Sequence, residues 1–182
     1  MKPIYVSITR SGDISKAIRT LKEYRSSLVD KGEIFVQRLA ELGASAAKMT
    51  LASSGHGDSS RSALFSISFN VEGENVEGTL SITSEPNVTS DGRVFYPHLA
   101  WEFGAGIHYN NGNVNPNAAK MGMGVGTFPE QKNALNDYWW YRDKSGNLHL
   151  SQGTQATMPM YKASIEMIQS IERIAREVYG NG

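Results

Sequence analysis

Three residues in one short segment carry side chains that could bind a metal ion. His98 and Glu102 lie four positions apart in a strand-like stretch, and His108 follows shortly after. Imidazole nitrogens and carboxylate oxygens are ligands of zinc and iron. The spacing matches no defined metal site and Pro97 interrupts the stretch, so ordinary hydrogen-bonding roles are favoured. A small metal-dependent hydrolase using these three residues is the alternative function from another class.

Two further patterns that suggest catalysis have simpler explanations. The glycine-rich run 122–127 lacks the lysine and hydroxyl that follow a phosphate-binding loop, and Pro129 prevents an immediate helix. Ser54, His56 and Asp58 are neighbours in a Gly/Ser turn, whereas catalytic triads assemble from distant residues. The chain has no cysteine, which removes thiolate chemistry, disulfides and cysteine-based zinc sites. We therefore expect no catalytic residue, no metal and no cofactor, in a chain that is not an enzyme.

A row of four aromatic residues is the strongest indication of a binding surface. Tyr138, Trp139, Trp140 and Tyr141 are consecutive in the sequence. Neighbouring side chains of a strand point to opposite faces, so at least two of the four should be exposed or covered by a partner. Trp and Tyr are favoured anchors of protein interfaces. Stacking on single-stranded nucleic acid is the competing interpretation, but no basic groove surrounds the row.

Four basic residues, Lys16, Arg19, Lys22 and Arg25, lie on the polar side of a predicted helix. They form a candidate basic face that could contact a phosphate backbone or an acidic partner. Lys plus Arg equals Asp plus Glu at 18 each, so no overall field draws the chain onto nucleic acid or an acidic membrane. A solvated helix face is therefore the favoured interpretation, and contact with nucleic acid is the alternative.

The elements that position these residues begin with a helical part. The length of 182 residues fits a single domain, residues 1–182. Alternating residues predict a short strand at 4–9, and apolar residues at helical spacing then predict helix over 13–53. Gly32 either joins two helices or is absorbed in one long helix.

Strands are predicted in the middle of the chain. Apolar and polar residues alternate in 64–71 and again in 76–83, and the short link between them predicts a hairpin. A third extended stretch, 94–101, contains a proline and is typical of an edge strand or a bulge. The predicted sheet therefore covers 62–102, and a second hairpin at 137–151 continues it.

Between and after the strands lie a long loop and a closing helix. Residues 104–136 are rich in Gly and Asn with little periodicity, which is typical of a functional or disordered loop. The last helix is predicted over 159–179, because Pro159 suits a first turn and an apolar stripe follows. The residues of this stripe, which we expect to be buried, are Met167, Ile168, Ile171, Ile174, Ala175 and Val178. The predicted fold class is α+β: an antiparallel β-sheet with N-terminal helices and a C-terminal helix packed on one face.

Taken in order, these motifs resemble a family: the small tail-component proteins of the head–tail joining region of long-tailed bacteriophages, called tail completion or neck proteins. The stretch 14–49 is similar to the family's helical N-terminal half, and residues 100–104, Ala-Trp-Glu-Phe-Gly, resemble its Glu-Phe-Gly signature at the end of a strand. Residues 139–146 and 153–160 look like its late hairpin and the start of its last helix. The resemblance covers nearly the whole chain and rests on the order and spacing of short motifs.

The resemblance implies a virion protein that acts in a ring beneath the portal and above the tail tube, completing the tail or fastening it to the head. Its partners would be other copies of itself, with a six-fold ring expected, and neighbouring connector, head-closure, tail terminator or tail tube proteins. A passing contact with genomic DNA is allowed, and no membrane is involved. The protein would be found in the neck or tail end of the virion, and in the host cytoplasm during assembly. Tail terminator and head-closure protein are the alternatives within assembly.

The resemblance also implies candidate interface residues. Trp101, Glu102 and Phe103 of the signature join the row of four aromatic residues, 138–141, as candidates for contact with a subunit or partner. The long loop 104–136 departs from the family, and we expect it to become ordered against other subunits.

Overall fold

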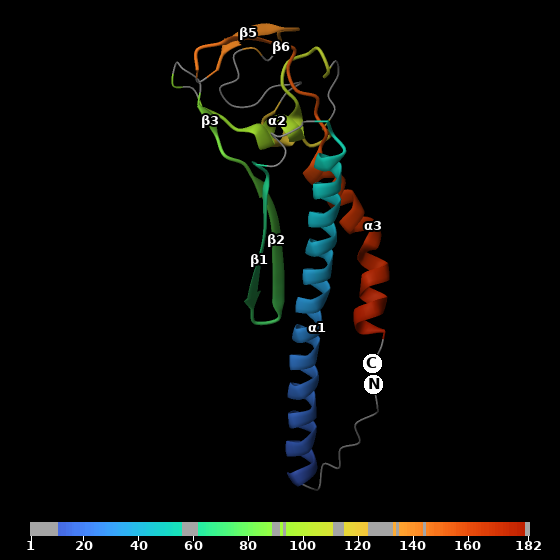
Figure 1. Cartoon of the computed structure of the whole chain (residues 1–182). Coiled ribbons are helices and arrows are strands. Elements are labelled where there is room, and N and C mark those ends of the chain that lie inside the picture. The colour runs from blue at the N-terminus through green and yellow to red at the C-terminus, as the bar shows by residue number, and fades with distance from the viewer. Residues whose placement is uncertain are drawn as a thin grey trace.

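A computed structural model describes residues 11–55, 62–88, 92, 94–110, 115–123, 133, 135–143 and 145–180. It contains a long helix at each end and short antiparallel strands between them (Figure 1), so the predicted mixed α+β class is confirmed. The elements in chain order are α1 (Ser11–Ala52), β1 (Leu64–Glu72), β2 (Asn75–Thr83), β3 (Asn87–Val88), β4 (Val94–Phe95), α2 (Pro97–Phe103), η2 (Ala119–Met121), β5 (Trp139–Arg142), β6 (Leu148–Ser151) and α3 (Pro159–Tyr179).

The first helix is continuous. α1 has 42 residues, and Gly32 is absorbed in it rather than joining two helices. A glycine inside a helix costs about 1 kcal/mol relative to alanine. Here it allows close packing, because a Cβ at Gly32 would lie 3.3 Å from the side chain of Val76 in β2. The strand predicted at 4–9 lies outside the described residues.

The described strands form three separate two-stranded antiparallel sheets, which corrects the expectation of one continuous sheet. In the longest pair Phe65 lies opposite Ile82 and Ile67 opposite Leu80. Directly opposite side chains share a face, so this register gathers the apolar residues on one side. β3 pairs with β4, and β5 pairs with β6.

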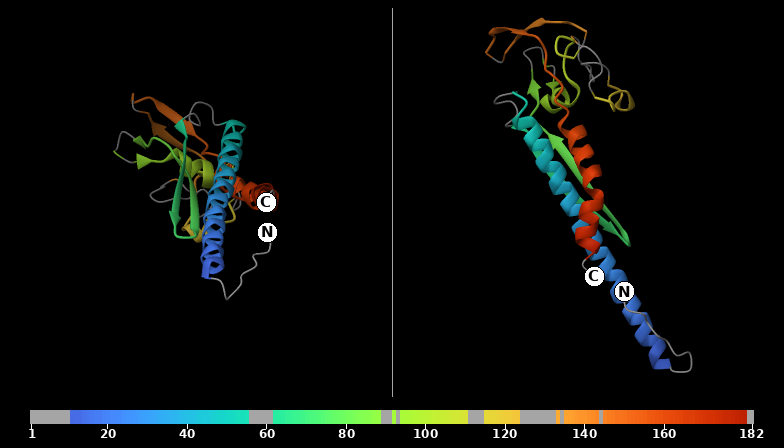
Figure 2. Two further views of the ribbon diagram at one scale, coloured as in Figure 1. Left: turned by 90° about the horizontal axis from the view of Figure 1, so that it is seen from below. Right: turned by 90° about the vertical axis from the view of Figure 1, so that its right-hand side faces the viewer.

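The long helix α1 packs against both the β1–β2 hairpin and α3. The β1–β2 hairpin and α3 lie on different sides of it, and its residues 11–24 project beyond both (Figures 1 and 2). Ala40, Ala44 and Ala47 of α1 are buried where the three elements meet. Small side chains allow this close approach. The helices therefore pack mainly on each other, and not side by side on one face of a sheet as predicted.

The prediction of an extended stretch at 94–101 is correct for Val94 and Phe95 and wrong from Pro97 onward. Only Val94–Phe95 is strand, and α2 begins at Pro97. Proline has no N–H to lose in a first helical turn, and its fixed φ suits that position. The helix places Ala100 in a second small core with Ala105, against which Trp139 packs.

The closing helix occurs where it was predicted, at 159–179. Only part of the apolar stripe of α3 is buried. Ile174 and Val178 are buried, but Ile168 and Ile171 are 62% and 45% exposed, which corrects the expectation of a fully buried stripe. Both side chains line an open groove between α3, α1 and β2. No helix in the described part of the chain is long and apolar enough to cross a membrane.

Candidate functional site

Glu102 holds the first turn of α3. Its Oε2 accepts a hydrogen bond of 2.9 Å from the amide of Met160, and its Oε1 accepts one of 3.0 Å from the amide of Tyr161. Amides in a first helical turn have no partner within the helix, and the helix dipole favours a negative charge there. A carboxylate on α2 thus caps a helix that begins 57 positions later in the chain, at Pro159.

A buried asparagine completes this cap. Asn115 Nδ2 donates to Glu102 Oε1 at 2.8 Å, and Asn115 Oδ1 accepts from the amide of Asn117 at 2.9 Å. Burial raises the pKa of the Glu102 carboxyl above its ordinary value. The hydrogen bonds from α3 and Asn115, and the nearby Lys162 ammonium, act in the opposite direction without overcoming burial.

A second buried asparagine joins the loop after α2 to the segment before α3. Asn110 is fully buried, donates to the carbonyls of Gly106 and Thr154, and accepts from the amide of Ala156. Ala105 and Thr154 also exchange two main-chain hydrogen bonds, of 2.9 and 2.8 Å. Asn110 and Asn115 therefore lie inside the subunit. For these two residues, the expectation that the loop 104–136 becomes ordered against other subunits is corrected.

The Trp-Glu-Phe signature belongs to this interior. Trp101, Glu102 and Phe103 are 2%, 9% and 3% exposed. The carbonyl of Trp101 also accepts hydrogen bonds from the amides of Thr157 and Met158. These residues join α2 to the start of α3, and this corrects the expectation that they form a contact surface.

The three candidate metal ligands do not converge. His98 Nδ1 lies 2.9 Å from Ser84 Oγ, and His108 Nδ1 lies 3.2 Å from Asp137 Oδ1. Glu102 is held by α3. Within the described ranges, no three His, Cys, Asp or Glu side chains form a group that could hold a metal ion. The geometry that a metal-dependent hydrolase would need is therefore not found among these three residues.

The Ser84 hydroxyl caps the first turn of α2. The amide of His98 donates to Ser84 Oγ at 3.2 Å, and the same oxygen faces the His98 ring. Burial lowers the pKa of His98, which favours the neutral imidazole that can accept the hydroxyl proton. A hydroxyl used in this way supports α2. Glu102, the carboxylate nearest in sequence, is bound to α3 rather than to His98.

The exposed aromatic surface lies on the β5–β6 hairpin. Trp140 is paired with Leu150, and Leu148 is paired with Arg142. Directly opposite and alternate residues share a face, so Trp140, Leu148 and Leu150 form one apolar patch. They are 59%, 54% and 51% exposed, and we call these three residues the aromatic hairpin face. The prediction that at least two of the four consecutive aromatic residues would be exposed is confirmed.

The opposite face of this hairpin attaches it to the molecule. Trp139 is half-buried and packs against Gly106 and Gly153, where a Cβ would meet its ring. Tyr141 stacks on His149 with ring centroids 5.4 Å apart. The outward face is thus presented on a hairpin that is attached to the molecule through Trp139.

The turn of the hairpin is organised by one carboxylate. Asp143 accepts hydrogen bonds from the amides of Ser145 and Asn147, and from the side chains of Asn147 and His149. The hydrogen bond from His149, followed by that from the Asn147 side chain, lowers the pKa of Asp143 to about 2. These contacts fix the position of β6 relative to β5.

The candidate basic face is exposed on the projecting part of α1. Lys16, Arg19, Lys22 and Arg25 are all exposed. Arg19 pairs with Glu23 of the same helix, and Arg25 pairs with Glu74 at the tip of the β1–β2 hairpin. The face is therefore solvated, and part of its charge is already neutralised within the chain.

The sequence did not single out Asn110 or Asn115. Each stands in a Gly/Asn-rich segment without periodicity, so no pattern separated the two buried asparagines from their exposed neighbours. Comparison with known proteins returns no match among family models, curated proteins or solved structures.

Proposed function

We propose that this chain is a structural protein of the head–tail joining region of a long-tailed bacteriophage, completing the tail or fastening it to the head as a subunit of a ring. The order of its sequence motifs supports the proposal. The structural observation that carries it is the aromatic hairpin face, Trp140, Leu148 and Leu150, which is exposed at one end of an elongated molecule (Figure 1).

An exposed apolar surface of this kind is suited to assembly. Contiguous apolar patches on a surface mark sites of interaction, and tryptophan is enriched among the residues that dominate binding energy. The patch lies on a strand pair whose turn is fixed by Asp143. Little conformational entropy is then lost when a partner covers it, which favours binding.

The two-stranded sheets add a second assembly feature. Each described strand pair has open edges, because neither partner is flanked by a further strand. Free edge groups can pair with a strand of another chain. Ring subunits need two different surfaces that fit each other, and strand edges of neighbouring subunits can pair in this way.

Mass spectrometry of purified phage particles tests the proposal directly. The protein should be present in the copy number of a single ring, measured against the portal and major capsid proteins. Its absence from particles would contradict the proposal. In infections without the protein, filled heads and separate tails should accumulate. Tails of unregulated length would identify a tail terminator instead.

A variant links the role to the aromatic hairpin face. Trp140→Ser should leave the folded protein as stable as the wild type but prevent its incorporation into particles, since the removed ring is exposed. Met121→Ser is the matched control, because Met121 is 60% exposed and lies outside this hairpin. Equal incorporation of both variants would show that the hairpin face is not the contact.

A further inference from the structure

One face of α1 is apolar along most of the helix but is flanked by other elements over only part of it. Residues 11–24, which we call the arm, project beyond the hairpin and α3 (Figures 1 and 2). Ile14, Ile18, Leu21 and Tyr24 of the arm are all exposed. An amphipathic helix is stabilised mainly by packing of its apolar face. The face carries, at helical spacing, Ile14, Ile18, Leu21, Leu28, Gly32, Phe35 and Leu39.

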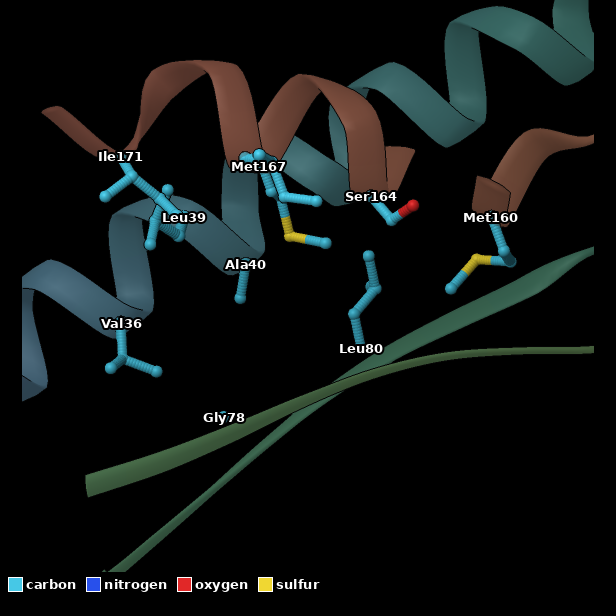
Figure 3. A pocket seen from close by; sticks show the side chains of 10 residues that line it. Val36, Leu39, Ala40, Gly78, Leu80, Met160, Ser164, Met167 and Ile171 are labelled. Atoms are coloured by element: carbon cyan, nitrogen blue, oxygen red, sulfur yellow. The ribbon is translucent and has the colours of Figure 1, made fainter. Parts of the chain in front are cut away.

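Beyond the arm the same face becomes the floor of an open groove. β2 forms one wall and α3 the other, and the side chains of Leu80, Met160 and Met167 lie around it (Figure 3). A second section with Leu28 and Gly32 on its floor continues the groove toward the hairpin tip, and Val36 lines both sections. The groove is mainly apolar and open to solvent.

The arm matches the groove in length. Residues 11–24 and the floor residues 28–40 are each about 20 Å long at the rise of an α-helix. Grooves of this kind accept an amphipathic helix through apolar residues spaced three and four apart. Ile14, Ile18 and Leu21 have that spacing.

The charges also match. The arm carries three basic residues, Lys16, Arg19 and Lys22, and two acidic ones, Asp13 and Glu23, so it has a small net positive charge. The hairpin that forms one wall carries Glu72, Glu74 and Glu77 and has no Lys or Arg between residues 64 and 83. Opposite charges at the edge of an interface favour correct pairing. Within one chain, Arg25, which directly follows the arm, already pairs with Glu74.

We infer that the free protein is a two-fold dimer in which the arm of each copy lies in the groove of the other. Arm and groove share one face of one helix, so two α1 helices packed antiparallel fill both grooves at once and leave no arm exposed. In this arrangement Ile18 packs beside the partner's Phe35. A parallel pairing would set arm against arm and leave both grooves empty. The inference concerns the protein before assembly and does not rest on the proposed head–tail role.

Sedimentation of the full-length chain over a range of concentrations tests the dimer. Ile18→Asp should raise the dissociation constant at least 100-fold, because it puts a carboxylate into an apolar interface. Ser27→Asp, an exposed position on the other side of the same helix, is the matched control and should sediment like the wild type. Circular dichroism of Ser27→Asp should match the wild type, whereas Ile18→Asp should lose at most the helical signal of the arm, because neither residue belongs to the core. A wild-type monomer at all concentrations, or a dimer that survives Ile18→Asp, would overturn the inference.

Cysteine cross-linking tests the orientation. The chain has no cysteine, so single cysteines report unambiguously. A short bismaleimide should link two copies of Leu28→Cys, which lies near the two-fold axis. It should not link two copies of Ile14→Cys, which antiparallel pairing separates by about 37 Å along the helix. Efficient linking of Ile14→Cys would overturn the antiparallel arrangement. None of these outcomes decides the role in the virion, which the particle composition tests separately.

Discussion

The carboxylate of Glu102 in α2 accepts a hydrogen bond of 3.0 Å from the amide of Tyr161 in the first turn of α3. It links α2, which contributes Ala100 to the small core, to one of the two long helices. Together with the bond from Met160, this contact fixes the first turn of α3 to α2. Because Met160 also lines the groove beside α1, Glu102 holds one end of that groove in place.

Replacing Glu102 with alanine should lower the free energy of unfolding by about 2–4 kcal/mol, because three donors lose their acceptor in a buried site. Urea denaturation monitored by circular dichroism measures this change. Glu166→Ala is the matched control, since Glu166 is an exposed glutamate of α3 and should change stability by less than about 0.5 kcal/mol. Equal effects of the two variants would contradict the capping role.

The pH dependence of stability should show the raised pKa of Glu102. Burial raises the pKa above 4.5 in the folded state, so over the window just above 4.5 the folded protein binds more protons than the unfolded chain. This contribution to stability is fully present below that window and is lost as pH rises through it. Glu102→Gln removes the titration, so the difference in unfolding free energy between wild type and variant should move in favour of the wild type as pH falls. A difference moving the other way would show that hydrogen bonding outweighs burial.

The turn of the β5–β6 hairpin should lose stability in acid, because the pKa of Asp143 is lowered whereas that of Glu102 is raised. The pKa of Asp143 is lowered from 3.8 to about 2 in the folded state, first by the hydrogen bond from His149. Its contribution is present above 3.8 and is lost as pH falls toward 2. His149→Phe should raise the Asp143 pKa toward 3.8, measured from the carboxyl carbon shift by NMR. His108→Phe, which removes the partner of Asp137, should leave the Asp143 pKa unchanged.

The elements with strong periodicity were predicted from sequence. Strict alternation predicted the β1–β2 hairpin, and the apolar stripe and Pro159 predicted α3. In such segments the local pattern and the tertiary packing favour the same structure. The row of aromatic residues was informative for a similar reason, because adjacent side chains of a strand cannot all face one core.

The elements that depend on distant contacts were not predicted. Residues 94–101 were predicted to be extended, yet the chain is helical from Pro97 because Ser84 caps that end and the buried side chains of α2 pack against the rest of the chain. The roles of Asn110 and Asn115 depend on carbonyl and carboxylate groups brought near by the fold. Which face of α3 is covered depends on where α1 and β2 lie, so the exposure of Ile168 could not be deduced from its own helix.

Two glycines with similar backbone angles provide the last test. Gly153 and Gly146 have φ of 89° and 84°, in the left-handed region that favours glycine. A Cβ at Gly146 would meet nothing within 4 Å, whereas a Cβ at Gly153 would overlap the main-chain oxygen of Ala105. That oxygen accepts the amide of Thr154, so it cannot move without breaking the bridge between the two segments.

Gly146→Ala should therefore cost only the conformational strain of about 1–2 kcal/mol. Gly153→Ala should cost about 2 kcal/mol more, since main-chain overlap adds to the same strain. Thermal unfolding compares the two variants. The fluorescence of Trp139, whose ring packs beside Gly153, should shift to longer wavelength only in Gly153→Ala. Equal melting temperatures would mean that the bridge between Ala105 and Thr154 does not hold the β5–β6 hairpin against the core.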